Sequence, residues 1–321
     1  MSTIIWAVHD GKIGMANQTL GLAEAAAAIL NATVVGKSLV LRAPWTWLPP
    51  HLWPAPLAAL DASGDRLAPP WPDILISCGR LVAAPARAAK RASGGRIFWV
   101  QVQDPRFGGR EADLTVKPQH DGAGGANVFV TLGAVHRVTP ARLAEGGRRF
   151  GPALAGLKRP LITVLLGGDN RAYRLTAERL ATLTAQLRQL TVQGYGLAIT
   201  TSRRSGGRAA MQLRQALPEA FIWSGDGDNP YFGLLALADA FVVTADSVNM
   251  VSEAAATGKP VHVVELAGGS AKFARFHAAM REAGITRRFT GTIERWTYSP
   301  LNDTARAAAE VARRFRARRP P

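Results

Sequence analysis

A short segment near residue 250 combines residue types that suit a sugar and a diphosphate. An apolar run at residues 241–243 leads into Asp246 and Ser247, and hydrophobic residues then recur at helical spacing before a second apolar run at residues 261–264. This pattern predicts a β-α-β unit whose capped helix N-terminus lies at the carboxyl edge of a parallel sheet, where anions bind. Glu253 could accept two hydrogen bonds from a vicinal diol such as a ribose. The alternative is an ordinary β-α-β unit with a good cap.

Three further loops of the second half follow predicted strands and carry glycine, arginine or aromatic residues. In chain order they contain Gly167 and Gly168, Arg203 and Arg204, and Asn229 and Tyr231. Glycine amides and paired arginines suit phosphate, and the aromatic loop suits a nucleobase. A tight turn would explain the glycines equally well. Four such loops at one sheet edge are harder to explain by structure alone.

The first half offers a second polar loop and two acid–base pairs. The loop after the first predicted strand, residues 9–18, contains Gly14, Asn17 and Gln18 before a helix, which suits an anion or a sugar but matches neither a P-loop nor a dinucleotide fingerprint. Imidazole exchanges a proton near neutral pH, so His120 with Asp121 is the first candidate base. The pair of His9 and Asp10 competes with it. A purely structural histidine is the alternative.

Composition narrows the class of protein. The chain has 321 residues, a formal charge of +16 and one cysteine. The charge would suit nucleic acid, an anionic membrane or a phosphorylated substrate, but no zinc-finger spacing, RNP motif or basic heptad region is present, which argues against nucleic acid. Cys78 ends an apolar run and is predicted to be buried and inert, and no cysteine-cluster metal site can form. Without a secretory signal or a membrane-spanning run, we expect a cytoplasmic protein.

A tryptophan-rich segment at residues 41–53 suggests a membrane contact. It carries Trp45, Trp47 and Trp53 among prolines, beside Arg42. Tryptophan favours the membrane interface and arginine attracts anionic lipid, so this segment could seat the protein on the inner face of the cytoplasmic membrane. The alternative is a loop packed on its own domain.

Strand-like and helix-like patterns alternate throughout and predict an α/β fold of two Rossmann-like doubly wound domains facing a cleft. We expect a first domain at residues 1–150, a linker at 151–160, a second domain at 161–300, and a C-terminal helix with a basic tail at 301–321 that packs toward the first domain. In the first domain, strands are expected at 3–9, 33–38, 74–77, 97–101, 114–116 and 128–131, and helices at 18–30 and 82–90. In the second, strands are expected at 161–166, 196–200, 221–223, 241–243 and 261–264, and helices at 176–191 and 209–217. The C-terminal helix is expected at 303–318.

The chain resembles the plant mitochondrial-fission family named for its elongated-mitochondria mutant, together with bacterial relatives described as glycosyltransferases. The matching stretches run from residue 10 to about residue 280. They are DGKIGMANQTLGLAEA, ISCGR, QVQDPR, KPQHDG, NVFVTLGAVHRV, LLGGDNRAY, TTSRRS, DNPYFGLLALADAFVVTADSVNMVSEAAATGKPV and KFARFHAAM.

This resemblance implies a fold like that of the GT-B glycosyltransferases, with a nucleotide-sugar bound mainly by the C-terminal domain. Glu253 would then meet the ribose, and Ser247, Asn249 and Met250 would lie by the diphosphate. Gly167 and Gly168 would face it across the cleft, and the loop from Gly14 to Gln18 would face the acceptor.

The leading hypothesis is a glycosyltransferase that needs no metal or cofactor and takes a nucleoside-diphosphate sugar as donor. No clustered DxD-type metal signature is present. Arg203 or Arg204, with Lys259, would stabilise the departing diphosphate, and His120 or Asp10 would deprotonate a lipid-linked or cell-envelope acceptor. The plant members recruit a fission GTPase rather than catalyse a reaction, so a nucleotide-binding adaptor at a membrane surface is the second hypothesis. A nucleotide-sugar epimerase is the third.

Overall fold

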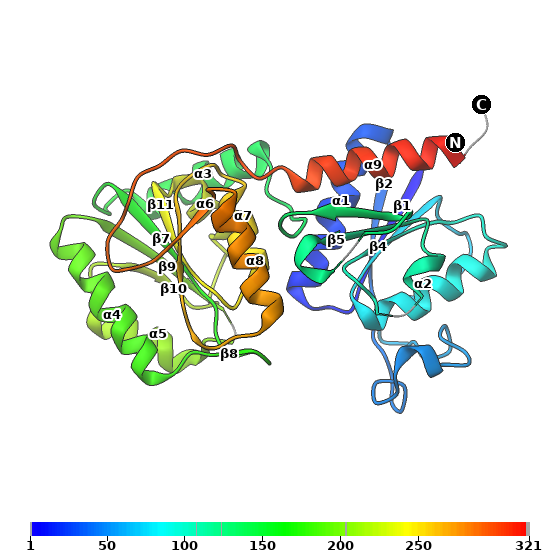
Figure 1. The fold of residues 1–321 in the computed structure, drawn as a ribbon, viewed down its shortest axis with the longest axis horizontal. Coiled ribbons are helices and arrows are strands. Elements are labelled where there is room, and N and C mark those ends of the chain that lie inside the picture. Colours follow the sequence, from blue (N-terminus) through cyan, green and yellow to red (C-terminus); the bar gives the residue numbers. More distant parts are fainter. Residues whose placement is uncertain (1, 107, 123, 203, 319–321) are drawn as a thin grey trace. The chain divides into compact units, whose positions relative to one another are not determined.

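Each half of the chain folds around its own sheet of six parallel strands (Figure 1). The computed structural model describes residues 2–106, 108–122, 124–202 and 204–318. Contacts group the chain into unit 1, residues 1–137 and 302–321, and unit 2, residues 138–301. The predicted α/β class with two Rossmann-like sheets is therefore confirmed.

The sheet of unit 1 has the strand order β2-β1-β3-β4-β5-β6. Its strands are β1 (Ile4–His9), β2 (Thr33–Ser38), β3 (Ile74–Cys78), β4 (Phe98–Val102), β5 (Leu114–Pro118) and β6 (Val128–Thr131). The order reverses between β1 and β3, and this reversal is the topological switch point where ligands bind in open α/β sheets.

Helices cover both faces of this sheet, so its strands are apolar on both sides. The covering helices are α1 (Ile13–Leu30), α2 (Arg80–Ala92) and α9 (Asp303–Arg318). Ile5 and Ala7 of β1 share a core with α1 and α9, which lie side by side (Figure 1), whereas Trp6 and Val8 pack in the core that includes α2. Cys78 is fully buried in the first of these cores, as predicted.

The sheet of unit 2 has the strand order β10-β9-β7-β11-β12-β14. Its strands are β7 (Leu161–Leu166), β9 (Gly196–Thr201), β10 (Phe221–Trp223), β11 (Ala240–Thr244), β12 (Val261–Val264) and β14 (Thr286–Arg288). When the six strands of this sheet are numbered along the chain, this is the dinucleotide-fold order 3-2-1-4-5-6, with its switch point between β7 and β11. A small antiparallel pair, β8 (Tyr173–Arg174) with β13 (Ala267–Gly268), adjoins it.

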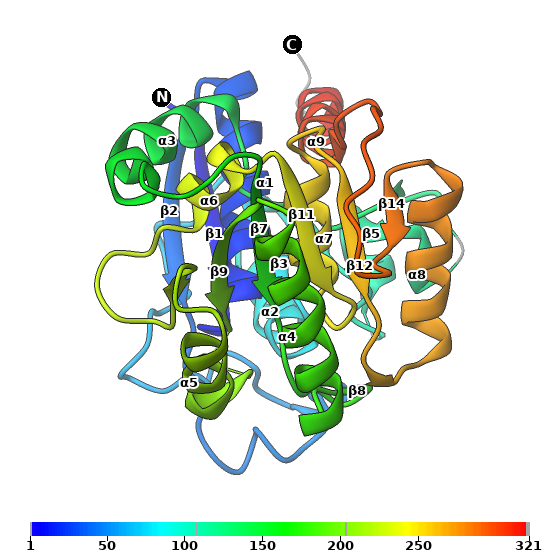
Figure 2. The same ribbon diagram turned by 90° about the vertical axis from the view of Figure 1, so that its left-hand side faces the viewer.

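Six helices of the described chain belong to unit 2. They are α3 (Pro140–Leu154), α4 (Ala177–Val192), α5 (Gly206–Ala216), α6 (Tyr231–Leu237), α7 (Val248–Ala255) and α8 (Ala271–Glu282). Leucines of α4 and α5 pack with Ile162 and Val164 on one face, and Leu154 of α3 packs with Leu161 and Leu234 of α6 on the other. Figure 2 shows β11, β12 and β14 in succession with α8 beside β14.

The boundary between the units differs from the expected one. We expected the first domain to extend to residue 150 and a linker at residues 151–160, but α3 begins at Pro140 and belongs to unit 2. A Cβ atom on Gly146 of α3 would lie 2.6 Å from the backbone nitrogen of Gly233 in α6, so the two helices touch almost backbone to backbone. This close packing of Gly146 on Gly233 ties α3 to unit 2, whereas Gly151 and Gly156 of the expected linker have open space around them.

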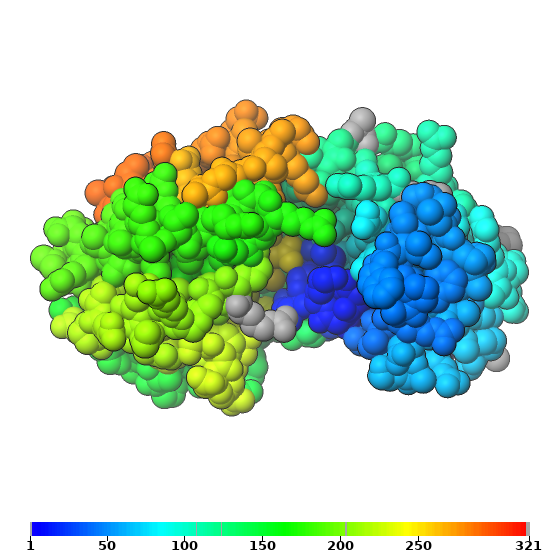
Figure 3. Space-filling model, turned by 90° about the horizontal axis from the view of Figure 1, so that it is seen from below, coloured from blue at the N-terminus to red at the C-terminus, as the bar shows by residue number. Residues whose placement is uncertain are grey.

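The segment at residues 39–73, between β2 and β3, includes the tryptophan-rich residues 41–53 and a 3₁₀ turn at Pro50–Leu52. Trp53 is buried and packs edge-to-face on Trp45 with ring centroids 6.2 Å apart, whereas Trp47 is 79% exposed. Figure 3 shows this segment, in the lighter blue, on the surface of unit 1. Among the described residues, no helix is both long and apolar enough to cross a bilayer.

Candidate functional site

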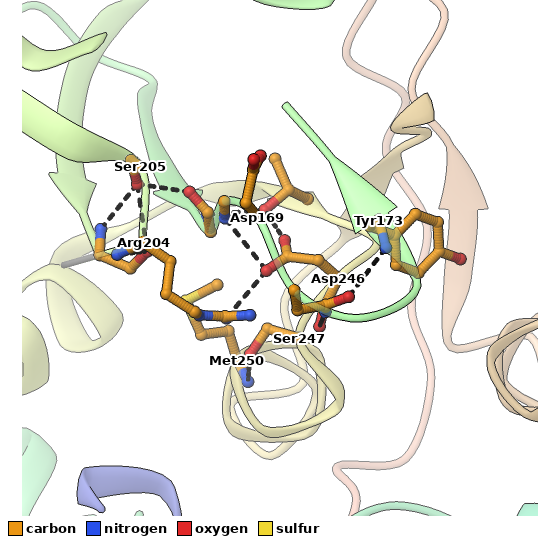
Figure 4. Close-up of polar contacts among 12 residues, drawn as sticks. Asp169, Tyr173, Arg204, Ser205, Asp246, Ser247 and Met250 are labelled. Atoms are coloured by element: carbon orange, nitrogen blue, oxygen red, sulfur yellow. Dashed lines mark hydrogen bonds and ion pairs between the residues drawn. The ribbon is translucent and has the colours of Figure 1, made fainter. Parts of the chain in front are cut away.

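The carboxyl ends of β7 and β11 bring two predicted loops together at the switch point of unit 2. These strands pair in register, with Leu165 opposite Val243. Figure 4 shows the polar residues that follow them, with the carboxylate of Asp246 at the centre of the contacts.

Asp246 organises this edge of the sheet. Its Oδ1 accepts from the hydroxyl of Thr244 at 2.7 Å, and its Oδ2 accepts from the Gly168 amide at 3.1 Å and from the guanidinium of Arg204 at 2.8 Å. The carboxylate side chain is fully buried. A buried charge requires such partners, and here all of them come from the protein. Asp246 is predicted as a ligand contact. Its buried carboxylate instead holds the surrounding loops in position.

Gly167 and Gly168 are needed for a close approach of two chain segments. A Cβ atom on Gly167 would lie 2.0 Å from Oδ1 of Asp246, and one on Gly168 would lie 2.3 Å from the backbone of Arg204. The Gly167 amide donates to Thr244 Oγ1 at 2.7 Å, and that of Gly168 donates to Asp246. The expectation that these amides donate to a phosphate is thus corrected, because both already have protein acceptors.

Arg204 is held at the same edge by the loop that follows β9. The Ser205 hydroxyl donates to the carbonyls of Leu166, at 3.0 Å, and Gly167. The side chain of Arg204 remains 41% exposed while it pairs with Asp246. Its guanidinium thus reaches solvent beside the N-terminal turn of α7. Arg203, its predicted partner in a phosphate clamp, lies outside the described residues.

The N-terminus of α7 lies at the same edge as the Asp246 network. Ser247 is its N-cap and accepts a hydrogen bond from the Met250 amide at 3.3 Å. Residues 247–250, which include Asn249, are partly exposed. The first amides of an α-helix have no acceptor within the helix, and the helix dipole adds positive potential there. The predicted capped helix N-terminus is therefore formed, and its first turn is partly exposed.

Glu253 lies further along α7 and contacts the first residue of α6, Tyr231. Tyr231 donates its hydroxyl to Glu253 Oε2 at 2.5 Å, and Asn229 Oδ1 accepts from the Tyr231 amide at 3.0 Å. Burial raises the pKa of Glu253 to about 7, although the hydrogen bond from Tyr231 lowers it. Only 5% of Glu253 is exposed. The structure thus brings Asn229, Tyr231 and Glu253 together in one contact.

Lys259 does not join this site. It follows the C-terminal end of α7 and precedes β12, so it lies at the amino edge of the sheet, opposite Ser247. Its ammonium group donates to the carbonyl of Ala236 at 2.6 Å, and burial lowers its pKa. The expectation that Lys259 stabilises a diphosphate is corrected by this position.

Asn170 and Thr244 belong to the site but were given no role from sequence. The Asn170 amide group donates to the Asp246 carbonyl at 3.1 Å, and its Oδ1 accepts from the amides of Ala172 and Tyr173 at 2.7 and 2.8 Å. An asparagine shortly after a strand and two glycines is typical of such side-chain turns. The position of Thr244 at a strand end carries no comparable signal.

The candidate loop of unit 1 is shorter than expected. Helix α1 begins at Ile13 rather than near residue 18, so Gly14 and Asn17 lie within its first turns. Gln18 is buried, and its Oε1 accepts from the Gln103 side chain at 3.2 Å. Gln18 therefore contributes to the core at the switch point of unit 1. Lys12, the N-cap of α1, makes no side-chain capping bond.

The two acid–base pairs of unit 1 have different surroundings. Asp10 forms an ion pair with Lys12, while the ring of His9 accepts from the Gly11 amide at 3.2 Å and burial lowers the His9 pKa. His120 lies in a 3₁₀ turn after β5 and is 3% exposed, with its Nε2 3.9 Å from the Asp121 carboxylate. In the described residues no group of three His, Cys, Asp or Glu side chains is arranged to hold a metal ion.

The sequence of this chain matches the model of a known protein family. A family model described as mitochondrial fission ELM1 matches residues 13–315. The chain belongs to this family. The expected membership of the mitochondrial-fission group is thereby confirmed.

Two proteins are similar to this chain in sequence. The mitochondrial fission protein ELM1 of Arabidopsis thaliana is 34% identical over 276 residues, which cover 77% of this chain and 65% of the plant protein. An uncharacterized Rickettsia prowazekii protein, RP120, is 24% identical, and the match covers 96% of this chain and 97% of that protein. The chain thus spans less than two thirds of its plant relative.

Solved structures of other proteins share the fold of this ELM1 family member. Acinetobacter baumannii MurG has a TM-score of 0.52 at 15% identity and covers 100% and 96% of the two chains. Neisseria meningitidis UDP-GlcNAc 2-epimerase, bound to UDP-GlcNAc, has a TM-score of 0.52 at 12% identity over 98% and 100%. The Escherichia coli ADP-heptose LPS heptosyltransferase II has a TM-score of 0.50 at 12% identity over 99% of each chain. These likenesses confirm the GT-B-like fold.

Proposed function

We propose that the chain is a glycosyltransferase that takes a nucleoside-diphosphate sugar and needs no metal ion. The arrangement at the switch point of unit 2 carries this proposal. There the capped N-terminus of α7 lies beside the exposed guanidinium of Arg204, and Glu253 follows on the same helix, held by Tyr231 of α6. Switch points at the carboxyl edge are the ligand sites of this architecture.

Each part of the nucleotide-sugar has a partner in this arrangement. The diphosphate lies at the first amides of α7, where the helix dipole and Arg204 stabilise the charge that builds up as it leaves. Glu253 accepts hydrogen bonds from the ribose hydroxyls through the carboxylate oxygen not held by Tyr231. The base lies against the loop that contains Asn229. Asp246 keeps the glycine turn and Arg204 in position, as its buried contacts indicate.

The acceptor step is assigned to unit 1. Asp10 or His120 removes the proton from the acceptor hydroxyl, and Asp121 orients His120. A lipid-linked or cell-envelope acceptor agrees with the exposed Trp47 and with the formal charge of +16. The solved structures with this fold include a protein bound to UDP-GlcNAc, which supports a nucleotide-sugar donor. They also include a lipopolysaccharide heptosyltransferase, which supports a cell-envelope acceptor.

A binding screen tests the nucleotide-sugar proposal. Uridine, adenosine and guanosine diphosphates, each free and as sugar conjugates, are titrated calorimetrically at about pH 8, where Glu253 is ionised. At least one conjugate should bind, and Glu253→Gln should weaken it roughly tenfold or more because an ionised hydrogen-bond acceptor is lost. Glu282→Gln, an exposed glutamate on α8, is the matched control. Absence of binding by every nucleotide, or equal binding by both variants, would refute the proposal.

A nucleotide-binding adaptor is the second candidate. The observation that favours it is the state of the two candidate bases, since His120 is buried and Asp10 is engaged by Lys12. An adaptor binds the nucleotide through Glu253 but releases no nucleoside diphosphate when acceptor glycans are added. Release that depends on acceptor supports the transferase, and a new sugar epimer without acceptor supports an epimerase.

A further inference from the structure

A separate cavity of unit 2 lies between α8 and the strands β12 and β14. It has a volume of about 410 Å³ and is lined by Ala245, His277, Arg281 and Thr286 among others. Figure 2 shows these three elements side by side. The volume is in the range of small-molecule sites. None of Arg204, Ser247 and Glu253 lines this cavity, so it is distinct from the proposed nucleotide site.

Two buried side chains of the cavity wall have polar atoms without hydrogen-bond partners in the described structure. His277 is 6% exposed, and its Nε2 lies 2.8 Å from the carbonyl of Ala245. A carbonyl only accepts, so Nε2 carries the hydrogen, and Nδ1 of the neutral ring is an acceptor with no donor. Thr286 is 2% exposed, and its hydroxyl also has no partner. Such atoms are costly to bury unless a ligand or water satisfies them.

The charges around the cavity leave one arginine in excess. Arg288 pairs with Glu265 at 2.7 Å, and Arg287 forms an ion pair with Glu294. For Arg281, which is exposed at the cavity wall, no described carboxylate lies within ion-pair distance. The positive charge of Arg281 is therefore not balanced by a carboxylate of the lining. A guanidinium forms strong paired hydrogen bonds with a carboxylate, so a ligand that carries one would supply the missing charge.

We propose that this cavity binds a small acidic carbohydrate, a sugar that carries a carboxylate. Ring hydroxyls satisfy both orphan atoms, because a hydroxyl donates to His277 Nδ1 and either donates to or accepts from Thr286. The carboxylate pairs with Arg281. Neither a neutral sugar nor a simple anion satisfies all three groups. The site does not depend on the nucleotide proposal, because its three groups lie outside the nucleotide site.

Binding of D-glucuronate and D-glucose to the full chain tests this inference. Saturation-transfer NMR suits the millimolar affinity expected of ligands of this size. The unmodified protein should bind glucuronate more tightly than glucose. Arg281→Gln should weaken glucuronate roughly tenfold, because a charge-assisted contact is lost, and should leave glucose unchanged. Thr286→Val, which keeps the shape of the side chain, should weaken both sugars.

The matched control is Arg275→Gln, which removes the same charge from α8 at a position that does not line the cavity. It should bind both sugars like the unmodified protein, and thermal melting checks that each variant is folded. The inference is overturned if glucuronate does not bind, if Arg281→Gln and Arg275→Gln behave alike, or if Thr286→Val changes neither sugar. These outcomes leave the nucleotide screen unaffected, since that screen uses Glu253 as its probe.

Discussion

The two units present the same feature, a helix N-terminus at the switch point of a parallel sheet, in different ways. In unit 2, Ser247 caps α7, and the Asp246 carboxylate beside it is fully buried and bound by three protein groups. In unit 1, the N-cap of α1 is Lys12, which makes no capping bond and pairs with Asp10 while 65% of its side chain is exposed.

This difference indicates a division of labour between the units. A buried, fully bonded network cannot adjust to its ligand, so it suits a diphosphate of constant shape, which gains from donors fixed in advance. The Lys12 side chain, which is 65% exposed and long, can adjust to a variable partner. Unit 1 also carries nine of the eleven strongly exposed large hydrophobic side chains found in the described residues. A preorganised donor side and an adaptable acceptor side agree with the proposed reaction.

The largest expected effect comes from removing Asp246. Asp246→Ala leaves the Gly168 amide and the Thr244 hydroxyl without their acceptor and Arg204 without its counter-charge, which should cost about 3 kcal/mol of unfolding free energy. Asp10→Ala, its counterpart in unit 1, should cost less, about 1 kcal/mol, because its partner Lys12 is 65% exposed although the Asp10 side chain itself is only 12% exposed. Urea titration measures both, and hydrogen exchange locates the loss in unit 2. Equal losses would remove the contrast between the edges.

Glu253 should show the next largest effect, through pH. Its pKa is raised to about 7 by burial, so the folded protein keeps a proton that the unfolded chain releases near its ordinary pKa. The free energy of unfolding therefore falls as pH rises between about 4.5 and 7, by about 3 kcal/mol in total. Glu253→Gln removes this titration. The variant should be as stable as the unmodified protein near pH 4. At pH 8 its free energy of unfolding should be higher by about 3 kcal/mol.

Urea unfolding of both proteins across this pH range is the measurement. A constant stability difference from pH 4 to 8 would show that Glu253 titrates normally and is not buried as described. Since the same substitution should weaken nucleotide binding, a gain in stability with a loss of affinity would identify a residue kept for function.

Sequence patterns predicted the strands well and the site contacts only in part. The strands at Thr33–Ser38, Val128–Thr131 and Leu161–Leu166 have the expected bounds. Pro160 and Gly167 bracket the last of these apolar runs, and both residue types interrupt a strand. The start of α1 was wrong, since packing overrides the weak helix preference of Gly14 and Asn17. That Gly168 faces Asp246 depends on distances between neighbouring strands, which no local pattern encodes.

Glu310 of α9 in unit 1 should show the opposite pH dependence with a smaller effect. Hydrogen bonds from Arg313 and Arg314 lower the pKa of Glu310 to about 2, whereas burial opposes this. Its stabilising contribution is therefore present above its ordinary pKa and is lost as pH falls toward about 2. Arg313 is 66% exposed, so Glu310→Gln should cost less than about 1 kcal/mol at neutral pH. Urea denaturation at pH 7 and pH 3 should show that Glu310→Gln lowers the free energy of unfolding less in acid than at neutral pH. A larger loss of stability in acid would contradict this pH dependence.

The smallest effect on stability, and the sharpest test of an adaptable unit 1, comes from Trp47. Because its ring is exposed, Trp47→Ala should change the free energy of unfolding by less than about 0.5 kcal/mol, whereas Trp53→Ala, in the core beneath, should cost about 3 kcal/mol or more.

If this loop meets a membrane, Trp47→Ala should weaken binding to vesicles of anionic phospholipid in a sedimentation assay. Trp45→Ala is a poor probe, because Trp45 packs on Trp53. Equal sedimentation of the unmodified protein and Trp47→Ala would exclude the loop as the membrane contact, and the exposed apolar side chains of unit 1 would then favour a protein partner.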